Sequence, residues 1–440
     1  MVKYTKPEID NLVARAILVL SGLYPILLLS VRDGTATCFV LLLVLSVMSL
    51  YRFAWNDWSH GAIAFTFSMA CLFGATLLSQ LYHRSFHLES LDSPSRFLFA
   101  VPIYLMLRSF PLSFPRALEY AFPFGAFAGL LTSIFFPSAD WAITGTYFID
   151  PAQFGAAILS LAFLSIGSIN WTRQDPLGVV VLKLAGFLVG IFGAIQTGER
   201  GVWIAIPILT ILLAYYRLSW KWRGAAATIV IIAGLASYWI IPTVQDRIAY
   251  TQLELASLLN RDLDTSVGLR LQMWNAGIEI VRENPLFGIG PAQEVREEFR
   301  VMHERGWFTA LGFEAASSQI HNEILANAAR LGIFGLLSIL SIYFIPMILF
   351  IKATSSLVQM KRVAGIMGSL FVVLYFIVGL TIETFNIKTI STFYALTAAV
   401  LLATAHATYG IKSEGKVDAD SSGVSTRRDG GRDGFAWAKM

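Results

Sequence analysis

The sequence predicts an all-α, polytopic integral membrane protein with about 12 transmembrane helices and one large, mostly helical loop. Composition is the first reason: the 440 residues are 56% hydrophobic and only 14% charged, too little charge to cover the surface of a soluble protein of this size. The second reason is that apolar runs of about 17–25 residues recur along the chain, and each can cross a hydrocarbon core of ~30 Å.

These apolar runs define the predicted spans. They fall near residues 16–31, 36–51, 61–81, 97–107, 117–137, 153–170, 177–196, 201–216, 224–242, 322–351, 363–382 and 389–410. Lys3, Lys6 and Arg15 precede the first run, but no small-residue cleavage site follows it. We therefore expect the first run to be a retained helix and not a signal peptide.

The short connections between spans predict how the chain is oriented. Lys and Arg gather in alternate connections, which the positive-inside bias places in the cytoplasm together with both termini. The expected organisation is transmembrane residues 1–242, a loop at 243–318 on the opposite side, transmembrane residues 319–411, and a disordered cytoplasmic tail at 412–440. In a Gram-negative cell this is a multi-pass inner-membrane protein with a periplasmic loop.

Charge and cysteine content exclude two other classes of protein. The formal charge of +4 comes from basic residues whose first role is topological. The lipid bilayer, and not nucleic acid, is therefore the predicted partner of the basic residues. Cys38 and Cys71 both lie inside apolar runs, so no disulfide framework is expected.

The large loop contains a predicted amphipathic helix in the segment SVGLRLQMWNAGIEIVRENP, beginning at Ser266 as N-cap and ending at Pro285. Its apolar positions follow helical spacing and form one stripe: Val267, Leu271, Trp274, Ile278 and Val281. We expect this stripe to pack on protein or on the membrane interface, leaving Arg270 toward a polar space.

A turn and a second helix follow in the loop. Gly288 and Gly290 allow a tight turn or a close backbone approach. The second helix is expected at about residues 292–305, with Val295, Phe299 and Met302 on one side.

The loop has seven arginines and no lysine. The planar guanidinium suits bidentate contact with phosphate or carboxylate groups. Most of these arginines are expected to pair with nearby acids on solvated faces, namely Arg247, Arg261, Arg296, Arg300 and Arg305. Arg270 and Arg282 remain candidates for ligand binding.

Arg200 is a further candidate, because it lies between Gly198 and Gly201 at the start of a span on the loop side. Flanking glycines and a helix N-terminus together favour the binding of an anion. The alternative is an interfacial arginine paired with Glu199. The residues alone favour neither.

His321 stands at the entrance of the next span, in the segment SSQIHNEILANAARLG. The positive end of a helix dipole disfavours the imidazolium, so a neutral ring could serve as a general base for a hydroxyl. The alternative is an interfacial capping residue. Glu323, Asn327 and Arg330 then form a polar stripe that enters the membrane, which predicts a cavity beside it.

Three motifs together carry a family resemblance: RGVW near residue 200, RLQMW followed by NPLFGIGP, and HNEIL-x-N-x-x-RLG. With these motifs and the loop before the last three spans, the chain resembles the O-antigen ligases, within the ligase/polymerase superfamily of bacterial surface polysaccharides. The resemblance implies transfer of a glycan from undecaprenyl diphosphate to lipid A–core, with no metal, nucleotide or other cofactor.

The resemblance also implies roles for particular residues. His321 would deprotonate the acceptor hydroxyl, while Arg200 and Arg270 would hold the diphosphate. Arg282, Asn322 and Arg330 complete the predicted substrate-binding set. An O-antigen polymerase, a protein-glycosylating oligosaccharyltransferase and a lipid-linked-oligosaccharide flippase or other transporter remain alternatives. Transport predicts functional charges near the membrane midplane, where Lys183 is the main charged residue.

Overall fold

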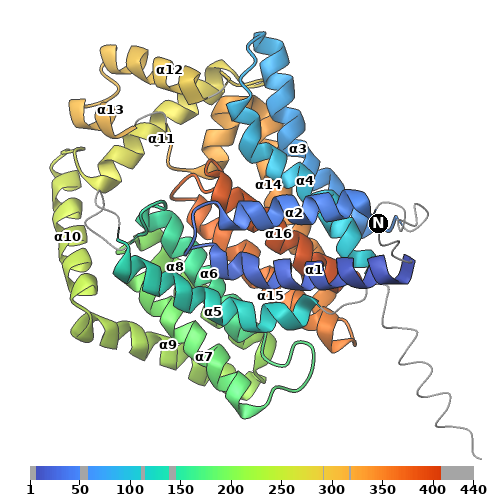
Figure 1. The fold of residues 1–440 in the computed structure, drawn as a ribbon. Helices are drawn as coiled ribbons and strands as arrows, with labels where there is room; N and C mark the ends of the chain where they lie inside the picture. The colour runs from blue at the N-terminus through green and yellow to red at the C-terminus, as the bar shows by residue number, and fades with distance from the viewer. Residues whose placement is uncertain are drawn as a thin grey trace, which may run out of the picture.

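The computed structural model describes residues 6–49, 58–110, 114–137, 145–290, 292–316 and 319–407. These residues form helices joined by short connections, and contain no β-strand (Figure 1). The helices are α1 (Lys6–Leu27), α2 (Gly34–Met48), α3 (His60–His83), α4 (Glu89–Ser109), α5 (Phe114–Phe135), α6 (Pro151–Gly167), α7 (Leu177–Gln196), α8 (Arg200–Arg217), α9 (Trp220–Ile240), α10 (Pro242–Leu259), α11 (Ser266–Glu283), α12 (Ala292–Glu304), α13 (Ala310–Ala316), α14 (Glu323–Thr354), α15 (Gln359–Gly379) and α16 (Lys388–Ala405).

The polytopic all-α prediction is confirmed. Within the described ranges, nine helices are long and apolar enough to cross a membrane: α1, α3, α5, α7, α8, α9, α14, α15 and α16. Helices α2 and α6 are apolar but shorter, and α4 carries four charged residues. Each predicted apolar run falls on one of these helices, while the count of twelve spans stays a prediction. The predicted tail at 412–440 lies outside the described residues.

The centre of the bundle is α16, which is buried at every residue from Ile390 to Ala405. It lies in the middle of the molecule and α9 lies at the edge (Figure 1). No residue of α9 is buried. An apolar helix with no buried face suits a hydrocarbon surround, since lipid tails solvate its side chains.

Lys183, the charge expected near the midplane, is buried in a structural network. Its Nζ donates hydrogen bonds to Asp175 Oδ2 at 2.7 Å and to the Ser168 carbonyl at 2.8 Å. Glu119 Oε1 lies 4.0 Å from the same Nζ and accepts a hydrogen bond from the Thr172 backbone N–H. These contacts join α5 and α7 to the connection between α6 and α7. Lys183 therefore stabilises the packing of these helices.

The loop segment at 243–318 contains α10, α11, α12 and α13, of which sequence analysis predicted only α11 and α12. The last three gather at one end of the bundle (Figure 1), where α11 and α12 contact α14 and α13 contacts α11 and α12. The second predicted helix is confirmed as α12, with Val295, Phe299 and Met302 buried.

The buried face of α11 differs from the predicted stripe. Leu271 and Ile278 are 39% and 46% exposed, whereas Met273, Ala276 and Ile280 are buried. Small side chains decide this orientation, because they let α14 approach closely. A Cβ at Gly277, for example, would lie 3.0 Å from the Leu325 side chain. The N-cap also differs from the prediction: Thr265, and not Ser266, accepts the hydrogen bond from the Gly268 N–H.

The Pro285–Gly290 segment inserts into a break in α14. Gly332 interrupts the helix with φ of 62°. The exposed backbone there pairs with the inserted segment: Gly290 N–H donates to the Arg330 carbonyl at 3.0 Å, and Ile333 N–H donates to the Pro285 carbonyl at 2.8 Å. The insertion thereby fixes the backbone that carries Arg330.

Gly332→Ala should destabilise the protein by about 2–5 kcal/mol, because φ is positive and a Cβ would collide with the Leu286 carbonyl. Gly288→Ala should behave alike, since its Cβ would collide with the Arg330 backbone. Thermal unfolding of the purified protein measures both losses. Gly74→Ala is the control, as a Cβ there meets nothing within 4 Å. Equal melting temperatures for all three variants would contradict this role of the insertion.

Candidate functional site at the ends of α8, α11 and α14

Arg200 joins three helices at the start of α8. Its guanidinium pairs with the Glu254 carboxylate of α10, and its Nη2 donates to Ser266 Oγ of α11 at 3.0 Å. The Glu254 carboxylate also accepts the Ser266 N–H at 3.1 Å. Sequence analysis weighed an anion-binding site against an ion pair with Glu199. The observed partner is not Glu199 but Glu254. Arg200 is therefore already neutralised by an acid that is 3% exposed.

Two other arginines beside it, Arg270 of α11 and Arg247 of α10, have no direct partner. Both are half-buried, and neither guanidinium makes a hydrogen bond or an ion pair within 4.0 Å to any described residue. Arg247 lies over Gly198, where a Cβ would be 2.7 Å from its Nε. Sequence analysis expected Arg247 to pair with an acid, and this was wrong because α10, which sets its position, was not predicted.

The acids Glu199 and Glu254 offset most of the positive charge of the three arginines. Burial nevertheless leaves Arg270 poorly solvated. Burial lowers the pKa of Arg270, Glu199 opposes this, and Arg200 lowers it further. Burial likewise raises the pKa of Glu199, against the attraction of Arg270 and Arg247. A guanidinium remains charged under such shifts. A multiply charged anion would therefore be drawn to Arg247 and Arg270.

His321 lies outside α14, one residue before the N-cap Asn322. Its backbone is left-handed, with φ of 53°, a strained conformation that cross-packing must hold in place. Trp274 Nε1 donates to its carbonyl at 3.4 Å. The ring atom Nδ1 is buried and has no hydrogen-bond partner among the described residues.

The surroundings of His321 favour the neutral form of its ring. Burial lowers its pKa, Glu383 opposes this, and Arg270 lowers it further. The pKa of His321 is therefore lowered, in the direction that the sequence predicted. The cause is burial, whereas sequence analysis attributed it to the helix dipole. A neutral ring with an unpartnered nitrogen can accept a proton.

Glu383 links His321 to Arg330. The carboxylate of Glu383 accepts the Ile320 N–H at 2.6 Å through Oε1, and its Oε2 lies 2.6 Å from Arg330 Nη2. Arg330 is thus held at the same junction as the histidine. Its own role in binding a substrate stays a prediction.

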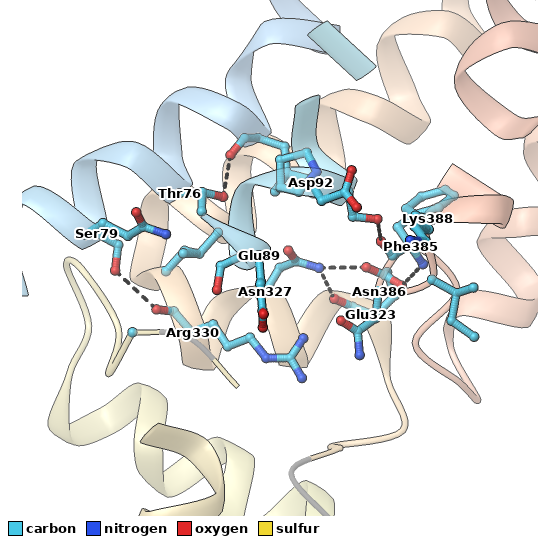
Figure 2. A pocket seen from close by; sticks show the side chains of 18 residues that line it. Thr76, Ser79, Glu89, Asp92, Glu323, Asn327, Arg330, Phe385, Asn386 and Lys388 are labelled. Carbon is cyan, nitrogen blue, oxygen red and sulfur yellow. Dashed lines mark hydrogen bonds between the residues drawn. The ribbon is translucent and has the colours of Figure 1, made fainter. Parts of the chain in front are cut away.

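Beside this junction lies a cavity of about 390 Å³ (Figure 2). Glu323, Asn327 and Arg330 of α14 form one wall, as the polar stripe in the sequence predicted. The opposite wall comes from α3, α4, the segment before α16 and the first residue of α16, with Glu89, Asp92 and Lys388 among its residues. The prediction of a cavity beside the stripe is confirmed.

The remaining two candidates have other surroundings. Asn322 accepts the Ile324 and Leu325 N–H groups through Oδ1, and its Nδ2 donates to the Leu380 carbonyl at 3.3 Å. Arg282 is 74% exposed and pairs with Glu279 at 3.3 Å. It lies twelve residues beyond Arg270 in the same helix, which is ~18 Å along the axis. The structure therefore groups Arg200, Arg270 and His321, and leaves Arg282 apart.

The segment that contains these residues is similar in sequence to known proteins. A sequence model of the O-antigen ligase family matches residues 185–340, which include every predicted site residue. An "O-antigen ligase" of Escherichia coli K12 is 30% identical over 152 residues, 34% of this chain and 36% of that protein. Over this part of its length the chain is similar to O-antigen ligases. A Haemophilus influenzae protein described as uncharacterized is 26% identical over 298 residues, 65% of this chain and 72% of that protein.

Proposed function

We propose that this protein is a ligase-type glycosyltransferase of the O-antigen ligase superfamily, which moves a glycan from undecaprenyl diphosphate to lipid A–core. The observation that carries the proposal is the buried His321 Nδ1, which has no hydrogen-bond partner among the described residues, on a ring close enough to Arg270 to feel its charge. Arg270 in turn lies near Arg247, and neither guanidinium has a direct partner among the described residues. A base for a hydroxyl and cations for a diphosphate are what this reaction needs.

The proposed reaction is a single displacement at the anomeric carbon of the donor glycan. The acceptor hydroxyl oxygen attacks the anomeric carbon of the donor glycan, and its proton passes to His321. The bond from that carbon to the diphosphate oxygen breaks, and undecaprenyl diphosphate leaves with the electron pair. Arg270 and Arg247 stabilise the negative charge that grows on the leaving group, while Arg200 holds α8, α10 and α11 together through Glu254.

The proposed orientation is the one that the basic connections predict. The α10–α13 segment faces the periplasm of the inner membrane, the undecaprenyl tail stays in the bilayer, and the diphosphate reaches the ends of α8 and α11. In this arrangement the segment acts as a cover over the reacting groups. No metal ion or nucleotide takes part.

The acceptor separates the proposed reaction from its alternatives. Purified protein in liposomes receives a lipid-linked glycan with and without lipid A–core, and products are separated by gel electrophoresis. A ligase forms product only with lipid A–core. Extension of the glycan on its carrier without lipid A–core would show a polymerase instead, and movement of the intact carrier without transfer would show a transporter.

The pH dependence of transfer should report on His321. The neutral ring is the active form, so activity is lost as pH falls through the pKa of His321, which lies below the ordinary value of about 6.5. Arg270→Gln removes a cation and should move this acid limb to higher pH. Glu383→Gln removes an anion and should move it to lower pH. Rate profiles of the three proteins test this, and shifts in the same direction would contradict it.

A further inference from the structure

The cavity beside Arg330 has no part in the step described above, although it is built as a binding site. Its floor is made by buried residues of α14, and its mouth by exposed residues of α4, of the segment before α16 and of the start of α16. We define the floor by the buried Glu323 and Asn327, and the mouth by the exposed Glu89, Asn386 and Lys388. Figure 2 labels all five among the lining residues.

The floor is rigid because its polar groups are satisfied. The Glu323 carboxylate accepts the Phe385 N–H at 2.9 Å and the Asn327 Nδ2–H at 2.8 Å. The mouth is different: the side chains of Glu89 and Asn386 make no hydrogen bond or ion pair to any residue that the structure describes. Polar side chains that lack a protein partner at the rim of a rigid cavity can form hydrogen bonds to a ligand.

The chemistry of the lining selects a class of ligand. Three carboxylates and two cations line the cavity, together with hydroxyl and amide groups. An acyl chain would leave these groups unpaired, and a phosphate would meet Glu89, Asp92 and Glu323. Sugar hydroxyls both donate and accept hydrogen bonds, so they match such a lining. A cavity of about 390 Å³ is in the range of small-ligand sites, roughly 300–1,000 Å³.

The cavity is connected to the proposed base through the chain and through Glu383. Glu323, on the floor, follows His321 by two residues. Arg330, on the wall, pairs with Glu383, whose other oxygen holds the Ile320 N–H just before the histidine. No residue of α11 lines the cavity, so the cavity and Arg270 approach His321 from different elements.

We propose that this cavity binds the terminal sugar of the acceptor and presents its hydroxyl to His321. The inference rests on the proposed function, and it divides the site into two parts. Arg270 and Arg247 take the diphosphate of the donor, and the cavity takes the acceptor sugar. Glu89 and Asn386 then recognise hydroxyl groups at the mouth.

The test compares acceptor and donor kinetics of two mouth variants, Glu89→Ala and Asn386→Ala. Both side chains are exposed, so folding should be retained, and thermal unfolding checks this. Each variant should raise the KM for lipid A–core ~10-fold, with the donor KM within ~2-fold. Glu283→Ala is the control, an exposed acid of α11 outside the cavity, and should leave both KM values unchanged.

Equilibrium binding of lipid A–core to the same proteins keeps the inference separate from the proposed reaction. Weaker binding in both mouth variants supports the cavity even if transfer is never observed. An unchanged acceptor KM in both variants would overturn it. A raised donor KM with an unchanged acceptor KM would also overturn it, because the cavity would then hold the donor glycan.

Discussion

His321→Asn should lower the rate of glycan transfer by ~10²–10⁴-fold, the usual contribution of a positioned general base. Asparagine tolerates the left-handed backbone at this position, where φ is 53°. The substitution therefore removes the base without the backbone change that other residues would bring. Turnover with lipid-linked donor and lipid A–core measures the effect.

Two comparisons secure the interpretation of His321→Asn. Its melting temperature should match that of the wild type, which shows that the fold is kept. His60→Ala, an exposed histidine at the start of α3, should retain turnover within ~2-fold. Wild-type turnover in His321→Asn would remove the histidine from the mechanism.

Arg270→Gln should reduce kcat by ~10²–10³-fold, the cost of removing one group that stabilises transition-state charge. The effect is expected to be large because Arg270 is half-buried and has no ion pair among the described residues, so its charge is available to a ligand. Arg270→Lys keeps the charge but loses the planar fork, and should fall between the wild type and Arg270→Gln. Steady-state kinetics at saturating donor distinguishes them.

Arg282→Gln is the matched control for Arg270→Gln, on the same helix. Arg282 is 74% exposed and pairs with Glu279 on the surface, so its loss should change kcat by less than ~2-fold, since exposed pairs contribute little. Equal effects of the two substitutions would show that the loop arginines act through general charge and not through one site.

The features that were predictable from the sequence depend on local periodicity. Apolar runs located the helices of the bundle, and the spacing of Val295, Phe299 and Met302 gave the buried side of α12. The stripe of Glu323 and Arg330 predicted a cavity because polar groups at membrane depth need polar surroundings. Each of these inferences uses residues within a few turns of one helix.

The features that were missed depend on contacts between distant segments. Glu254, the partner of Arg200, lies 54 residues further along the chain, on a helix that sequence analysis did not predict. The orientation of α11 follows from how closely α14 approaches Gly277, which the apolar pattern does not encode. The insertion at the Gly332 break likewise joins two segments that the sequence keeps apart.

The most direct test of the central claim is a stoichiometric transfer reaction with purified protein. Liposomes containing lipid-linked glycan and lipid A–core are incubated with a chelator and without nucleotide, and undecaprenyl diphosphate and glycosylated lipid A–core are quantified together. The proposed mechanism predicts that the two products appear in equal amounts, at a rate that the chelator does not change. Transfer that requires a metal ion or nucleotide, or that proceeds equally well in His321→Asn, would contradict it.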